Sequence, residues 1–140
     1  MTVRSLIHNK HLLWRAGFGA GINQFEDLKN KDSKTLLDEL LKEETFTYIN
    51  YDTPDTEIVD YMNDKSPAEK RKEIQKINRR QNEELNLNFL YKMVTGAEQL
   101  REKMAFFWHG HFASRVQNPK FNRQILNIIR KNALGNFRDL

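Results

Sequence analysis

A long stretch without helix-breaking residues constrains the fold of this chain most. Ser66-Pro67-Ala68-Glu69 has the pattern of a helix N-terminus, with a capping serine, a proline in the first turn and a glutamate three residues after the serine. Neither glycine nor proline follows before Gly96. We therefore predict one long helix over about residues 67–95, which would measure about 42 Å at 1.5 Å per residue.

Shorter helices are predicted on both sides of this long one. Residues 9–16 are expected to form a helix that ends at Gly17, followed by a tight turn. Asn118-Pro119 combines an N-cap with a proline at the first helical position. Residues 45–51 are rich in β-formers but have no partner strand, so we expect an extended connection there. Further helix starts are predicted near Asn23, Ser33, Thr53 and Thr95.

Together these signals predict an all-α fold, an irregular bundle of six or seven helices that forms a single domain over residues 1–140. Residues 87–94 are apolar around most of the helix circumference, so the second half of the long helix is expected to be buried. The next two helices are expected to bury one face each, formed by Leu100, Met104, Phe107, Trp108 and His111 in the first and by Phe121, Ile125, Ile128 and Ile129 in the second.

Charge is unevenly distributed along the chain. Residues 1–25 carry three basic and no acidic residues, residues 26–66 carry five basic and twelve acidic residues, and residues 67–140 carry fifteen basic and seven acidic residues. The basic part could contact nucleic acid. The basic residues of 70–80 are interleaved with glutamates at 69, 73, 83 and 84, however, and these dilute the positive field. Nucleic-acid binding is therefore only the last alternative.

The residue types that are missing exclude several classes of site. Without cysteine the chain can form neither a disulfide framework nor a thiolate zinc site, and it has no cysteine nucleophile. No apolar run approaches the roughly 20 residues that a transmembrane helix needs, and residues 1–10 lack the apolar core of a signal peptide. We therefore predict no transmembrane segment and no export signal in this sequence.

Residues 100–112 concentrate the chemically versatile side chains, with two histidines, a tryptophan and three phenylalanines. His109 and His111 could ligate a divalent metal, because neutral imidazole is a common metal ligand. Residues i and i+2 of a helix point about 200° apart, so both could bind one metal only if Gly110 ends or distorts the helix. A catalytic zinc also takes three protein ligands. The sequence is compatible both with a structural role for these two histidines and with a metal site.

Three blocks of the sequence carry a family resemblance. They are His11-Leu12-Leu13-Trp14-Arg15-Ala16-Gly17-Phe18-Gly19, then Leu100 to Met104 running into Phe107-Trp108-His109-Gly110-His111-Phe112, then Ala133-Leu134-Gly135-Asn136-Phe137-Arg138-Asp139-Leu140. In this order they resemble a large bacterial family catalogued as domain of unknown function 1800. The resemblance implies no reaction. It marks five further residues as possible binding positions, namely Arg15, Arg101, Trp108, Asn136 and Arg138.

The resemblance also implies that the chain is similar to the N-terminal part of a longer domain, in an exported or envelope-associated protein. The cap pattern of Asn136 and Asp139 agrees, because it predicts a helix that would continue past Leu140. Our first functional hypothesis is a helical interaction or scaffold part whose aromatic block forms the core. Its long charged helix would dock the remainder of the full-length protein or another protein. The alternative is a metal-assisted hydrolase to which His109 and His111 contribute ligands.

Overall fold

The computed structural model describes residues 3–21, 25–42, 46–50, 67–112 and 116–140. Within these ranges the chain is all-α, as predicted, and has no strand. Its elements are α1 (Val3–Ala16), α2 (Phe25–Asn30), α3 (Ser33–Leu41), α4 (Ala68–Thr95), α5 (Gln99–Phe112), α6 (Pro119–Asn132) and a short 3-10 turn, η2 (Phe137–Asp139). The predicted long helix is confirmed, since α4 has 28 residues.

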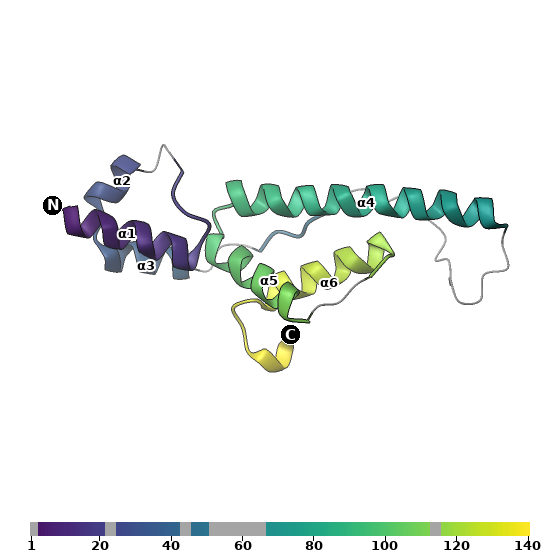
Figure 1. Ribbon diagram of the computed structural model, residues 1–140. Coiled ribbons are helices and arrows are strands. Elements are labelled where there is room, and N and C mark those ends of the chain that lie inside the picture. Colours follow the sequence, from purple (N-terminus) through teal and green to yellow (C-terminus); the bar gives the residue numbers. More distant parts are fainter. Residues whose placement is uncertain (1–2, 22–24, 43–45, 51–66, 113–115) are drawn as a thin grey trace.

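The helices form two groups around two apolar clusters (Figure 1). At one end, α1 packs against α2 and α3, and Leu13, Leu28 and Leu36 form the smaller cluster. At the other, α5 and α6 pack against each other and against one side of α4. The buried residues of this larger cluster are Ile49, Leu85, Phe89, Met93, Ala105, Leu126, Ile129 and Ala133.

Two side chains of α5 connect the two groups. The Gln99 carboxamide donates to the carbonyls of Met93 and Gly96, at 2.9 and 2.8 Å, and accepts a hydrogen bond from the Phe18 amide at 3.2 Å. The Lys103 ammonium donates to the carbonyl of Gly17 at 2.6 Å and to that of Trp14. The end of α1 is thereby fixed to the start of α5.

The predicted helix ends and starts are only partly confirmed. α1 ends before Gly17, whose amide donates to the Leu13 carbonyl at 2.8 Å, and Gly19 adopts a φ of 101° in the turn that follows. Asn118 caps α6 by accepting from the Lys120 amide at 2.9 Å. The predicted start at Thr95 is wrong, because its hydroxyl donates to the Tyr91 carbonyl at 2.8 Å within α4. The predicted caps Asn23, Thr53 and Ser66 lie outside the described residues.

The prediction that the second half of α4 is buried is wrong. Leu87, Tyr91 and Val94 are exposed by 64, 67 and 70%. The buried residues of α4 form a narrow row, because only one side of this helix contacts α5 and α6. That row consists of Asn78, Gln81, Leu85, Phe89 and Met93.

The predicted inner faces of α5 and α6 are also partly wrong. Met104, Trp108, Ile125 and Ile129 do pack at the larger cluster, but Phe107, His111, Phe121 and Ile128 are exposed. Each helix is rotated so that a charged residue points inward, Glu102 on α5 and Arg130 on α6. None of the helices in the described ranges combines the length and apolarity needed to cross a lipid bilayer.

Candidate functional site

A buried ion pair joins α5 to α6. The Glu102 and Arg130 side chains are exposed by 1 and 0%, and the guanidinium Nε lies 2.8 Å from one carboxylate oxygen while Nη2 lies 2.5 Å from the other. A bidentate pair of this kind fixes both the distance and the rotation of the two helices. The sequence pattern did not predict this pair, although Arg130 is a cation at an inward position between Leu126 and Ala133.

The same buried network holds the extended segment 46–50. Arg130 also donates to the Thr47 carbonyl at 3.0 Å and to the Asn127 side-chain oxygen at 3.2 Å. The Asn127 carboxamide accepts from the amide of Ile49 at 2.9 Å and donates to the carbonyl of the same residue at 3.1 Å. The described part of the predicted connection lies in neither a helix nor a strand, as expected, and Ile49 belongs to the larger cluster.

On the outer side of α5, five rings from the aromatic block and η2 gather into one group. We call Phe107, Trp108, His111, Phe112 and Phe137 the aromatic cluster. Trp108 lies at its centre, with ring centroids 5.0 Å from Phe107, 5.7 Å from His111, 5.9 Å from Phe112 and 5.6 Å from Phe137. Trp108 is half-buried against the larger core cluster, whereas the three phenylalanines and His111 are exposed.

Some of the residues marked by the resemblance lie in or beside the aromatic cluster, and others lie elsewhere. Asn136 accepts from the Arg138 amide at 3.2 Å and so caps η2, which brings Phe137 onto Trp108. Arg101 instead donates to the carbonyls of Arg130 and Lys131, at 3.2 and 3.0 Å, at the C-terminal end of α6. Arg15 lies exposed in the last turn of α1, in the other helix group.

The two histidines do not come together with further metal-binding side chains among the described residues. α5 continues through Gly110 to Phe112, so His109 and His111 point to different sides of a regular helix. The ring of His111 stacks on Phe107 at 6.1 Å. No group of three or more His, Cys, Asp or Glu residues in the described part of the chain is placed to hold a metal. A metal role for His109 and His111 stays a prediction.

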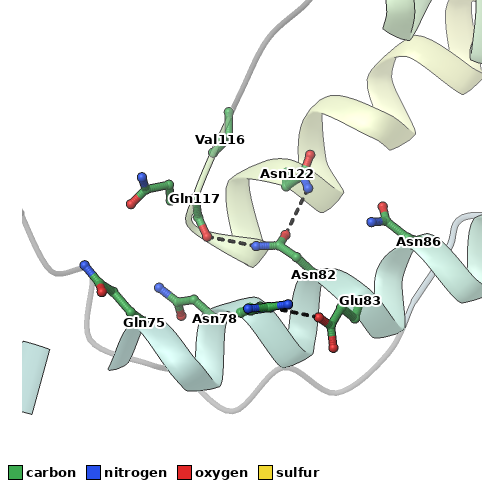
Figure 2. A pocket seen from close by; sticks show the side chains of 9 residues that line it. Gln75, Asn78, Asn82, Glu83, Asn86, Val116, Gln117 and Asn122 are labelled. Carbon is green, nitrogen blue, oxygen red and sulfur yellow. Dashed lines mark hydrogen bonds and ion pairs between the residues drawn. The ribbon is translucent and has the colours of Figure 1, made fainter. Parts of the chain in front are cut away.

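A second feature is a cavity of about 520 Å³ between α4, the start of α6 and the segment before it. Amide side chains dominate its lining: Gln75, Asn78, Asn82 and Asn86 from α4, and Gln117 and Asn122 from the opposite side (Figure 2). Asn82 lies in its middle, donating to the Gln117 carbonyl and accepting from the Asn122 side chain, both at 2.9 Å. The sequence pattern did not predict this cavity, although asparagine recurs every four residues at 78, 82 and 86.

Comparison with known proteins identifies the family. Residues 11–140 match the family described as "Protein of unknown function (DUF1800)". The chain belongs to this family. No curated protein and no solved structure matches the chain. The resemblance drawn from the three sequence blocks is thereby confirmed, and two of these blocks supply the five rings of the aromatic cluster.

Proposed function

We propose that this DUF1800 chain is a helical interaction module that binds another polypeptide through its aromatic cluster. The observation that carries the proposal is the exposure of Phe107, Phe112 and Phe137 around the half-buried Trp108. Contiguous exposed aromatic surface is typical of protein interaction sites, and aromatic side chains dominate the binding energy of such sites.

Rigid support of the cluster favours the same function. Trp108 packs on the core, α5 is fixed to α6 by the buried Glu102–Arg130 pair, and η2 is capped by Asn136. Rings held in this way lose little conformational freedom when a partner binds. The partner that we propose is the remainder of the full-length protein or another protein, in the exported or envelope-associated setting that the family resemblance implies.

Site-specific photo-crosslinking in the full-length protein tests this proposal. Phe112 on the cluster and Phe121 on α6 are a matched pair, since both are phenylalanines exposed by 40%. With benzoyl-phenylalanine at each position in turn, we expect position 112 to crosslink to one defined peptide and position 121 to stay unreacted. The crosslink from position 112 should disappear when Phe107→Ser is added. Mass spectrometry would show whether that peptide belongs to the same chain. Equal crosslinking at both positions, or none at 112, would refute the interaction surface.

Metal-assisted hydrolysis remains the alternative proposal, with His109 and His111 as two of the ligands. Metal analysis of the purified full-length protein tests it, because stoichiometric zinc, iron or manganese that is lost in His109→Ala/His111→Ala would favour the enzyme. The basic residues of α4 do not favour nucleic-acid binding, because Arg79 and Arg80 pair with Glu83 and Glu84 at 3.0 and 3.4 Å.

A further inference from the structure

The amide-lined cavity beside α4 has a regular spacing. Asn78, Asn82 and Asn86 lie four residues apart on one helix, so successive side chains are displaced by about 6 Å along the helix axis. Figure 2 shows them following one another along α4, with Gln75 before them. Asn78 is only 5% exposed, so Asn82 and Asn86, about 6 Å apart along the helix axis, present their carboxamides to the cavity.

This spacing is close to that of an extended polypeptide. The N–H and C=O of one residue in a strand point to the same side, and this arrangement recurs every second residue, at about 6.6 Å. A carboxamide offers both a donor and an acceptor and can therefore bind both groups of one residue. We propose that the asparagine row of α4, Asn82 and Asn86, binds an extended polypeptide segment of about three residues through its main-chain groups.

The chain already uses its carboxamides in this way elsewhere. Asn127 binds both the N–H and the C=O of Ile49 in the extended segment 46–50. Within the cavity itself, Asn82 donates to the main-chain carbonyl of Gln117, which precedes α6. Asn82 keeps spare capacity, because a carboxamide has two N–H groups and two oxygen lone pairs and its bonds to described residues use only one of each.

The chemistry of the lining favours a peptide over a sugar or a charged ligand. In the described part of the lining, Arg79 and Glu83 are the charged residues, and they pair with each other at 3.0 Å, so their charges cancel. Among the described residues no aromatic side chain lines the cavity, so none of them offers a ring to stack on a sugar face. The asparagine row matches an uncharged ligand whose donors and acceptors alternate. The main chain of a polypeptide is such a ligand.

Asn86 and Asn88 supply a matched pair of variants. Both are exposed asparagines of α4, but only Asn86 lines the cavity, and the two point about 200° apart around the helix. Because both side chains are exposed, neither Asn86→Ala nor Asn88→Ala is expected to unfold the domain. Neither residue belongs to the aromatic cluster, so failure here and failure of the proposed function are distinguishable.

The probe is a capped seven-residue peptide of alternating serine and valine, titrated into the whole chain and followed by NMR. We expect shifts of the Asn82 and Asn86 side-chain amides, binding about tenfold weaker in Asn86→Ala, and unchanged binding in Asn88→Ala. The same peptide with alternate amides N-methylated should not bind. Equal affinity of the methylated peptide, no shifts at millimolar peptide, or shifts with chitotetraose in place of the peptide would overturn the proposal.

Discussion

At the scale of single residues, the buried pair of Glu102 and Arg130 determines how this domain is assembled. An ion pair without water around it is costly to form, yet removing one partner is costlier, because the other is left as an uncompensated buried charge. Arg130 also donates to the Thr47 carbonyl and to the Asn127 oxygen, so its loss would leave Asn127 with only the Ile49 amide as a donor and would free the Thr47 carbonyl. The pair therefore fixes which faces of α5 and α6 point inward.

Arg130→Met should lower the free energy of unfolding by about 3–5 kcal/mol, because Glu102 would stay buried without its partner. Arg80→Met is the matched control, since Arg80 forms an exposed ion pair with Glu84, and it should cost less than about 1 kcal/mol. Urea denaturation measures both. Similar losses for the two variants would mean that the Glu102–Arg130 pair is hydrated in solution.

Asp32 should make the stability of α3 depend on pH. Its carboxylate accepts from the Thr35 hydroxyl and from the amides of Thr35 and Lys34, which lowers its pKa below the ordinary value of 3.8. A lowered folded-state pKa gives stability that is present above the unfolded-state pKa and is lost as pH falls through the folded-state pKa.

The melting temperature should therefore decline on the acid side, and this decline should be smaller in Asp32→Asn, which keeps a capping side chain without the charge. Asp38→Asn, on the same helix but away from its N-terminus, should leave the decline unchanged. Thermal melts over the acid range distinguish the two variants. An identical acid profile for Asp32→Asn and the parent would be inconsistent with this cap.

At the scale of whole elements, the sequence predicted where helices lie better than which faces they bury. Helix-capping and helix-breaking residues act locally. The helix end at Gly17, the helix start at Asn118 and the uninterrupted helix before Gly96 could therefore be predicted from the sequence alone. Burial depends on neighbours far away in the chain. Leu87, Tyr91 and Val94 are apolar but lie on the side of α4 that no described helix covers.

The candidate site, like the buried faces of the helices, was predicted only in part. The aromatic block and Asn136 were singled out from the sequence, but the rings of Phe107 and His111 were assigned to the core. These two rings are exposed because α5 is rotated so that Glu102 points inward. This rotation could not be predicted from the sequence, because a charged residue is expected at the surface unless its partner is known. The asparagine row was missed because amide residues give no apolar periodicity.

Trp108 and Trp14 should differ in what they contribute to stability. Trp108→Ala should cost about 2–3 kcal/mol, less than the 3–5 kcal/mol typical of a fully buried aromatic residue, because the ring is half-buried. Trp14 is 62% exposed, so Trp14→Ala should cost about 1 kcal/mol or less. Denaturant titration followed by circular dichroism measures both, and equal costs would contradict the packing of α5 described here.

At the scale of the whole molecule, cooperativity depends on the few contacts between the two apolar clusters. The smaller cluster is built from α1 to α3 and the larger from α4 to α6 and Ile49. Gln99 and Lys103 hydrogen bond from α5 to the end of α1 and the residues after it. Each group has too small a core to be very stable alone, so these bonds should couple the unfolding of both.

The double variant Gln99→Ala/Lys103→Met removes the hydrogen bonds between α5 and the end of α1 with the residues after it. We call these bonds the junction, and their removal should uncouple the unfolding of the two groups. Each group contains one tryptophan, Trp14 in α1 and Trp108 in α5, so the variants Trp108→Phe and Trp14→Phe report on each group separately. With the junction intact, we expect the two fluorescence transitions in urea to coincide, as a single domain requires. With the junction removed, the transition reported by Trp14 should move to lower urea, because the smaller cluster buries fewer apolar residues.

The control for this experiment is Lys131→Met, which removes an exposed lysine of α6 away from the junction and should leave both transitions together. If the transitions stay coincident after the junction is removed, cooperativity must come from the remaining contacts of α1 and α3 with α5. If they already differ in the parent, residues 1–140 are two folding units, and the prediction of a single domain is wrong.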